Sequence, residues 1–347
     1  MKPNYLETNW KHVLMGAIGL VIIAVSVPFI FESTQGPTTG GSELTSTSLM
    51  GSQEGHTLTF VNQCTETVWV GSVGNNGHAP LNGGGWEMAP TTTMSVQAPV
   101  GWSGRFWPRT GCSFNEEGLC PESGVKCCAS GSCLTSDNKN FGLECGFSGT
   151  PPASLIEPTF DAPSGNGPYD TYDVSFVDGW SVPVSMEPDQ GTFNPDPDPG
   201  IEAPWCRSSG CTSAPQCPDE FKVEGSPNSC WSPCQHSALL GDASAKLCCA
   251  CTMEPTPAGQ KPLTCPDAGC QYGCTPYHQP PYPEDMTCNP WDQDNPDRAW
   301  DATSLSYISA VKAVCPEVYS WQFDDHAATF QCRKTNGLVN YTVTFCP

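Results

Sequence analysis

Acidic side chains close to aromatic residues are the part of this sequence that could perform chemistry. The candidates are Glu157, Asp173, Asp178, Asp324 and Asp325. Carboxylates can accept hydrogen bonds from hydroxyl groups, or transfer protons as general acids and bases. Arg105 is set in the aromatic segment GWSGRFWPRTGC, although the chain has only 14 basic residues against 36 acidic ones. Taken singly, each acid is typical of a solvated surface, so a shared site requires the fold to bring them together.

Strand parity decides whether two of these acids can share a site. In one continuous strand, Asp173 and Asp178 would point to opposite faces, because side chains alternate and an odd number of positions separates them. Asp178 is followed by Gly179, a pair that predicts a β-hairpin between two alternating runs. With Asp178 in that turn, both carboxylates could border one groove.

Motifs for other chemistries are missing from the sequence. The six His are scattered without an HExxH pattern, and there is no GxSxG elbow, P-loop or dinucleotide fingerprint. The cysteine clusters at 248–251 and 265–274 could suggest a metal site, but an exported chain favours disulfides. The acidic run DQDNPD has Pro296 at the fifth position of a calcium loop and no Gly at the sixth. We therefore expect no metal site and no cofactor.

Cysteine content and charge indicate an exported, monomeric protein. The chain of 347 residues has 22 Cys, which an oxidising compartment would pair as disulfides. Its formal net charge is −22, whereas phosphate binding needs clustered Lys and Arg, so nucleic acid is not expected as a partner. Gly and Pro number 34 and 35, which suits short strands joined by loops.

The amino-terminal segment supplies a route out of the cytosol. The apolar run at 13–31 is longer than a usual secretory signal and slightly shorter than a usual membrane span. A plausible cleavage site, AVS, lies within it, so a cleaved signal and a membrane anchor both remain open. We assign 1–36 to this segment and 37–56, rich in Ser, Thr and Gly, to a linker. The rest is extracellular, either secreted or membrane-anchored, and Asn340 in NYT is its single N-glycosylation sequon.

Short alternations of apolar and polar residues, broken by Gly, Pro and Asn, predict strands along most of the remaining chain. The segments are HTLTFVNQCTETVWVGSV, GWEMAP, TTMSVQAP, SGRFWPRT, TYDVSFVDGWSVPVSM, ATFQC and NYTVTFCP. Residues 206–300 lack such a pattern and are dense in Cys and Pro, which predicts loops held by disulfides. One helix is predicted within 302–316, with Thr303 or Ser304 as its cap.

Several segments, in this order, resemble the thaumatin-like family of plant pathogenesis-related proteins, which has relatives in fungi and animals. FVNQCTETVW resembles the opening strand pair, and GGGWEMAP followed by APVGWSGRFWPRTGC resembles the family signature. PPASLIEPTF, YDVSFVDGWSVPV, CPEVYSWQFDD and NYTVTFCP match later parts. The resemblance covers residues 57–347. The chain departs from the family in having more cysteines than is usual, mostly within 206–300.

The resemblance implies an all-β fold: a flattened β-sandwich core with disulfide-rich loop domains and one or few short helices. The core would comprise 57–112, 149–212 and 316–347, with a small loop subdomain at 113–148 and a Cys-rich loop subdomain at 213–315. The disulfides carried over are Cys64–Cys346, Cys112–Cys120, Cys206–Cys332, Cys211–Cys315 and Cys217–Cys230. The adjacent cysteines at 127 and 128 leave the local pairing open.

The family's acidic cleft, marked by one Arg, one Glu and three Asp, has a match at every position. The matching residues are Arg105, Glu157, Asp173, Asp178 and either Asp324 or Asp325. The guanidinium of Arg105 would hold carboxylates in fixed geometry and offset their mutual repulsion. Aromatic residues close in sequence could face the groove, and they are Trp102, Trp107, Tyr172, Trp180 and Trp321.

Three functions follow from the resemblance. The first is binding of β-1,3-glucan or a related polysaccharide in the cleft, with a defence or cell-wall role. The second is a weak endo-β-1,3-glucanase, with Glu157 as the acid and Asp178 as the second catalytic carboxylate. The third is a membrane-perturbing defence protein without sugar chemistry. We favour binding over catalysis, because Arg105 beside Glu157 should lower the pKa of that acid and keep it ionised.

Overall fold

The computed structural model describes residues 55–163, 168–199, 201, 203–239, 253–256, 259–262, 302–321 and 324–347. The chain divides into two units, Met1–Glu54 and Gly55–Pro347. The expected signal or anchor at 1–36 and most of the linker at 37–56 lie outside the described residues. The linker ends earlier than expected, because Gly55 and His56 already belong to the first strand. Among the residues described, no helix is long and apolar enough to cross a membrane.

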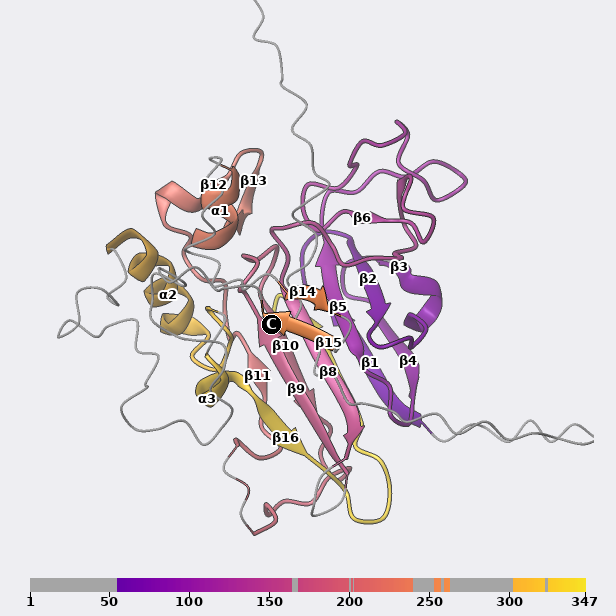
Figure 1. The fold of residues 1–347 in the computed structure, drawn as a ribbon, viewed down its shortest axis with the longest axis vertical. Coiled ribbons are helices and arrows are strands. Elements are labelled where there is room, and N and C mark those ends of the chain that lie inside the picture. The colour runs from indigo at the N-terminus through magenta and orange to yellow at the C-terminus, as the bar shows by residue number, and fades with distance from the viewer. Residues whose placement is uncertain are drawn as a thin grey trace, which may run out of the picture. The chain divides into compact units, whose positions relative to one another are not determined.

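Two β-sheets form the main part of the second unit (Figure 1). The five-stranded sheet has the order β11-β10-β17-β1-β4, and in it only β1 and β17 pair in parallel. Its strands are β1 (Gly55–Asn62), β4 (Thr93–Pro99), β10 (Val184–Pro188), β11 (Ser209–Gly210) and β17 (Tyr341–Phe345). The six-stranded sheet has the order β16-β9-β8-β5-β2-β3 and is antiparallel throughout. Its strands are β2 (Val68–Gly74), β3 (Gly85–Met88), β5 (Gly104–Arg109), β8 (Leu155–Ala162), β9 (Tyr169–Ser175) and β16 (Phe330–Cys332).

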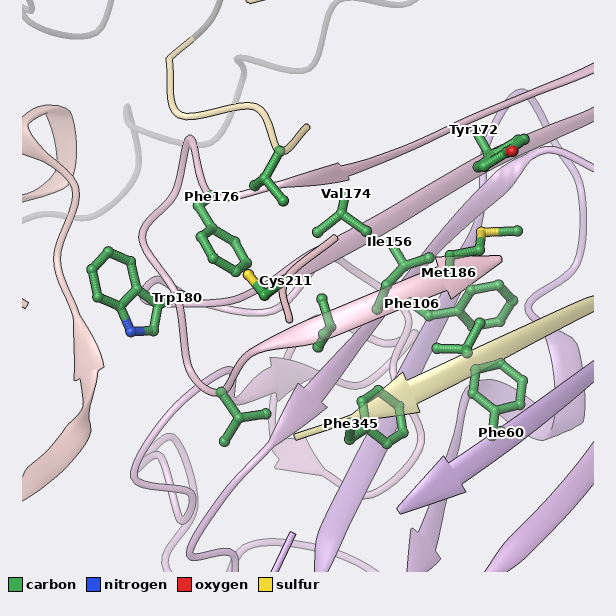
Figure 2. Packing of buried hydrophobic residues seen from close by; sticks show 14 of the residues in the cluster. Phe60, Phe106, Ile156, Tyr172, Val174, Phe176, Trp180, Met186, Cys211 and Phe345 are labelled. Atoms are coloured by element: carbon green, nitrogen blue, oxygen red, sulfur yellow. The ribbon is translucent and has the colours of Figure 1, made fainter. Parts of the chain in front are cut away.

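The two sheets pack face to face through one hydrophobic core (Figure 2). The ring of Phe60 on β1 lies 5.1 Å from that of Phe106 on β5, between centroids, and 6.2 Å from that of Phe345 on β17. All three side chains are fully buried. Burying a phenylalanine side chain stabilises the fold by about 1.5–3 kcal/mol, so such contacts hold the layers together. The expected all-β sandwich with few helices is confirmed.

Shorter elements flank the sheets. They are η2 (Leu81–Gly84), β6 (Cys133–Leu134), β7 (Phe141–Gly142), η3 (Asp219–Phe221), β12 (Lys222–Val223), β13 (Ser226–Cys230), α1 (Pro233–Leu239), β14 (Met253–Thr256), β15 (Gly259–Pro262), α2 (Ala302–Val314) and α3 (Asp325–Ala328). The predicted helix is α2, but it begins at Ala302, so both predicted caps lie inside it. Its buried hydrophobic side chains are Tyr307, Ile308 and Val311.

The hairpin predicted at Asp178 and Gly179 does not form. The chain does turn there, since the Gly179 N–H donates to the carbonyl of Phe176 at 2.9 Å and Gly179 has a φ of 84°. However, β9 belongs to the six-stranded sheet, whereas β10 after the turn pairs with β17 in the other sheet. The turn therefore carries the chain from one layer to the other. A local Asp-Gly signal specifies the turn, but not the sheet that the next strand joins.

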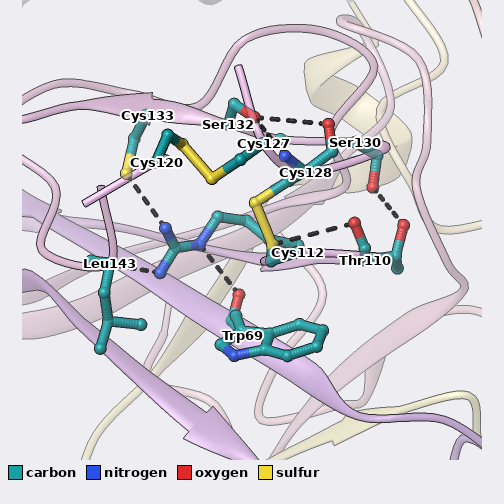
Figure 3. The surroundings of a disulfide bond; sticks show 12 residues. Trp69, Thr110, Cys112, Cys120, Cys127, Cys128, Ser130, Ser132, Cys133 and Leu143 are labelled. Carbon is teal, nitrogen blue, oxygen red and sulfur yellow. Dashed lines mark hydrogen bonds between the residues drawn. A yellow bond between two sulfur atoms is a disulfide. The ribbon is translucent and has the colours of Figure 1, made fainter. Parts of the chain in front are cut away.

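Disulfides fasten the loops to the sheets. Four of the bridges that the resemblance implies are present, namely Cys64–Cys346, Cys206–Cys332, Cys211–Cys315 and Cys217–Cys230. The expected Cys112–Cys120 bridge is wrong. The pairs are instead Cys112–Cys128 and Cys120–Cys127 (Figure 3). An antiparallel bridge between Thr110 and Ser130 explains the change, because it sets Cys112 opposite Cys128. Every described cysteine is in a disulfide.

A buried arginine joins the loop segment 113–148 to the six-stranded sheet. Arg109 is fully buried, and its guanidinium donates to the carbonyls of Trp69, Val70, Gly142 and Leu143 at 2.7–3.1 Å. Burial lowers its pKa to about 9. The four carbonyls accept from donors whose positions are fixed by one planar group, so the segment is held rigidly against β2.

Candidate functional site

Register across the six-stranded sheet brings three predicted residues into one row. Phe106 of β5 pairs with Ile156 of β8, so Arg105 lies opposite Glu157. Glu157 in turn pairs with Asp173 of β9. Directly opposite residues share a face of the sheet, and alternation puts this face on the side away from the core. Three side chains that are far apart in the sequence are therefore neighbours.

An ion pair joins the first two residues of this row. Nη2 of Arg105 lies 3.2 Å from Oε1 of Glu157, and the two side chains are 14% and 26% exposed. The guanidinium thus orients the carboxylate, and its buried Nε has no hydrogen-bond partner among the described residues.

Asp178 approaches the same residues from the turn after β9. Its Oδ1 accepts a hydrogen bond from Nε2 of Gln235 in α1 at 2.8 Å. It is within electrostatic range of both Arg105 and Glu157, and also of the buried Tyr307 in α2. We call the following residues the carboxylate cluster: Arg105, Glu157, Asp173 and Asp178.

Burial dominates the electrostatics of this cluster. Burial raises the pKa of Glu157 by more than the charge of Arg105 lowers it, and the charge of Asp178 adds to the rise. Burial also raises the pKa of Asp178, against the hydrogen bond from Gln235 and the charge of Arg105. The charge of Arg105 lowers the pKa of Glu157, as expected, but loss of solvation outweighs the ion pair, so the net shift is upward. A carboxyl with a raised pKa is suited to hold a proton.

The remaining predicted acids have different surroundings. Oδ2 of Asp324 lies 2.6 Å from Nζ of Lys312 in α2, and it accepts hydrogen bonds from the N–H and hydroxyl of Ser320. These contacts place Asp324 just before α3, with its carboxylate engaged by α2 and the preceding loop. The side chain of Asp325 lies outside the described residues.

The aromatic residues expected near the groove belong to the protein interior. All five, namely Trp102, Trp107, Tyr172, Trp180 and Trp321, are at most 5% exposed. Nε1 of Trp102 donates to the carbonyl of Ala79, and that of Trp107 donates to the carbonyl of Gly131, both at 2.9 Å. These rings are consequently not available as stacking surfaces for a ligand, and contacts at the cluster are predominantly polar.

Two residues around the cluster are missing from the sequence predictions, Gln235 and Tyr307. Gln235 lies in α1, within a Cys- and Pro-rich stretch that has no periodicity to indicate a helix. Tyr307 lies one turn before Val311 on the buried face of the predicted helix, and that spacing is the one signal that could have indicated it. Neither position reveals from sequence that it lies beside Asp178.

A second polar cluster, also missed, connects the two sheets. In His56 of β1, Nε2 lies 2.9 Å from Asp161 of β8 and Nδ1 lies 3.6 Å from Asp170 of β9. Within the described part of the chain, this is the one group of three His, Cys, Asp or Glu residues whose ligand atoms are close enough to hold a metal ion. These atoms already have partners, since Nδ1 is 2.7 Å from the carbonyl oxygen of Val339 and the hydroxyl of Tyr341 donates to Asp170 at 2.8 Å. We interpret the group as a buried contact between the sheets.

Comparisons with known proteins find relatives along most of the chain. The model of the Thaumatin family matches residues 62–268 and 258–347. Thaumatin-like protein 1 of Arabidopsis thaliana is 32% identical over 308 residues, which cover 86% of this chain and 88% of that protein. Pathogenesis-related thaumatin-like protein 3.5 of Cryptomeria japonica is 33% identical over 293 residues, covering 84% of this chain and 89% of that protein. A relative from Prunus avium named glucan endo-1,3-beta-glucosidase is 31% identical over 296 residues, covering 84% and 90%.

Proposed function

This chain belongs to the thaumatin family, and from that premise we propose that it is an exported defence protein whose carboxylate cluster binds β-1,3-glucan or a related polysaccharide. The observation that carries the proposal is the convergence of Arg105, Glu157 and Asp178, which come from a strand, a second strand and a turn. Export is supported by the pairing of every described cysteine, since disulfides persist in oxidising compartments.

The chemistry of the cluster suits a ligand rich in hydroxyl groups. Ionised carboxylates accept hydrogen bonds, and the Arg105 guanidinium, whose side chain is 14% exposed, can donate to a hydroxyl oxygen. A polyanion would be repelled by the clustered acids and by the net charge of −22. Because the nearby aromatic rings are buried, recognition depends on hydrogen bonds, and replacement of one polar partner should weaken it clearly.

Weak endo-β-1,3-glucanase activity is the second candidate. Its support is the raised pKa of Glu157, which would let this residue keep the proton that a glycosidic oxygen needs. The name of the Prunus avium relative favours the same substrate class. Asp178 would be the second carboxylate, although burial raises its pKa as well and so disfavours its ionised form.

The test scores binding and cleavage in one incubation. The exported protein is mixed with insoluble and soluble β-1,3-glucans, and we measure the fraction pulled down and the reducing ends released. Glu157→Gln keeps the shape and hydrogen bonding but removes the titrating proton. If Glu157 only binds, this variant retains most of the pull-down and releases reducing ends at the wild-type background.

The control replaces an arginine outside the carboxylate cluster. Arg207 also forms an ion pair with a glutamate, Glu317, but it is 61% exposed, so Arg207→Ala should bind glucan as the wild type does. Loss of hydrolysis in Glu157→Gln with binding intact would establish the glucanase instead. Absence of any glucan binding by the wild type would refute the proposal and leave a defence role without sugar chemistry.

A further inference from the structure

A pocket lies between the end of β2 and the loop segment 113–148, on the side of Arg105 away from Glu157. Its volume is about 310 Å³, and its lining includes Val73, Thr135, Ser136 and Glu144. That volume is at the lower end of the range of about 300–1,000 Å³ for small-molecule sites. No part of the carboxylate cluster lines it. The pocket is therefore a separate feature of the same face.

Register connects the pocket to the carboxylate cluster. Val73 of β2 pairs with Arg105 of β5, so one row across four neighbouring strands reads Val73, Arg105, Glu157, Asp173. Neighbouring strands are about 4.8 Å apart, which puts the Val73 backbone about 10 Å from that of Glu157. Arg105 lies between the two in this row. A chain-like ligand that continued from the cluster along this row toward Val73 would pass this arginine.

The walls of the pocket are fixed before any ligand binds. A disulfide joins Cys133 to Cys145, and Cys145 lines the pocket. The N–H of Gly146 donates to the carbonyl of Leu134 at 2.9 Å. A Cβ on Gly146 would lie 2.3 Å from Cα of Ser136, so the two walls approach as closely as glycine permits. A preformed site of this kind loses little conformational entropy on binding.

The lining mixes apolar and polar groups and contains no lysine or arginine. Thr135 and Ser136 supply hydroxyls, Glu144 a carboxylate and His78 an imidazole, which together offer donors and acceptors to a neutral polar ligand. Without a cation, an anionic ligand has no counter-charge there. Hydroxyl, carboxylate and imidazole groups in one small pocket can exchange hydrogen bonds with the hydroxyl groups of a sugar.

We infer that this pocket is a subsite for one sugar ring of the glycan chain whose neighbouring rings occupy the carboxylate cluster. The inference rests on the proposed function and adds to it a direction, because the chain would run from Asp173 past Arg105 to the loop segment 113–148. The pocket then contributes affinity only for chains long enough to span both places.

The experiment compares a short and a long ligand. Affinities for β-1,3-glucan trisaccharide and heptasaccharide are measured by calorimetric titration of the wild type and of Ser136→Trp, in which the indole fills the pocket. We expect the wild type to bind the heptasaccharide about tenfold more tightly than the trisaccharide, and Ser136→Trp to lose that gain while keeping the trisaccharide affinity. Lys139→Trp is the matched control, since it adds the same bulk to an exposed position on the same loop outside the lining.

A second variant guards against misfolding of the first. Glu144→Ala removes an exposed hydrogen-bonding group without adding bulk, and it should reduce heptasaccharide affinity about threefold with no effect on the trisaccharide. Equal heptasaccharide binding by Ser136→Trp and Lys139→Trp would overturn the inference and leave the proposed function standing. Equal loss for both lengths would also overturn it, because a subsite beyond the cluster cannot act on a chain too short to reach it. Failure of the wild type to bind either ligand would refute the proposed function itself.

Discussion

Protonation of Asp170 should make the stability of this protein depend on pH. The carboxyl is 3% exposed, it accepts hydrogen bonds from the Asp161 N–H and the Tyr341 hydroxyl, and it faces the ring of His56. Burial raises its pKa from 3.8 to about 6, against the charge of His56 and the two hydrogen bonds. Asp161 and Tyr172 also lie within electrostatic range of this carboxyl.

The direction follows from proton binding in the two states. In the unfolded chain Asp170 loses its proton near pH 3.8, whereas in the folded protein it does so near pH 6. Between these values the folded state binds more protons, so the free energy of unfolding falls as pH rises. The contribution is complete below about pH 4 and is lost above about pH 6. At about 1.4 kcal/mol for each pKa unit, its size is about 3 kcal/mol.

The assay is chemical denaturation with disulfides intact, at a series of pH values between about 4 and 7. The wild type is compared with Asp170→Asn, which keeps the shape of the side chain but cannot titrate. We expect the difference in unfolding free energy, wild type minus variant, to fall by about 3 kcal/mol across this range.

The control is an aspartate that is exposed and whose pKa is lowered, the opposite of Asp170 in both respects. Asp219 is 95% exposed and its pKa is lowered, first by the hydrogen bond from Lys222 and then by the charge of that lysine. Asp219→Asn should give a nearly constant difference over the same range, because solvent screens an exposed pair. Parallel curves for the wild type and Asp170→Asn would show that the reasoning about the buried carboxyl is wrong.

Four further predictions concern other parts of the molecule. Arg109→Met should lower the free energy of unfolding by at least about 2 kcal/mol in denaturant titrations, because two buried and two partly buried carbonyls lose their donor and each buried one costs about 1–3 kcal/mol; a loss below about 1 kcal/mol would contradict this. Arg105→Ala should raise the pKa of Glu157 further, since the removed charge lowers it, and should reduce glucan pull-down; unchanged binding would count against the cluster. Thiol labelling of the unreduced protein should detect almost none of the 22 Cys, and several reactive thiols would argue against a disulfide framework. Asn340 is half-buried and its Oδ1 accepts from the Thr57 N–H at 2.9 Å, so intact-mass measurement after eukaryotic secretion should find no N-glycan.

Local patterns in the sequence determined the elements of this protein. Alternation of apolar and polar residues indicated the strands, and the spacing of Ile308 and Val311 indicated α2, because both are properties of a few consecutive residues. The family resemblance also led to Arg105 and Glu157, whose motifs are contiguous stretches of chain. The Asp-Gly pair at 178 and 179 correctly placed a turn. All of these signals depend on neighbours in the sequence, which is why they could be seen without a structure.

Tertiary structure alone decided which elements pair and how far each side chain is removed from solvent. The pairing of Cys112 depended on the register between Thr110 and Ser130. The path of the chain after Asp178 depended on the pairing of β10 with β17 in the other sheet. Arg105 was expected to keep Glu157 ionised, but the raised pKa results from burial that several distant segments produce together. His56 and Asp170 are more than a hundred residues apart, and nothing in either local segment indicates their contact. Register and desolvation are sums over the whole fold, so no single stretch of sequence contains them.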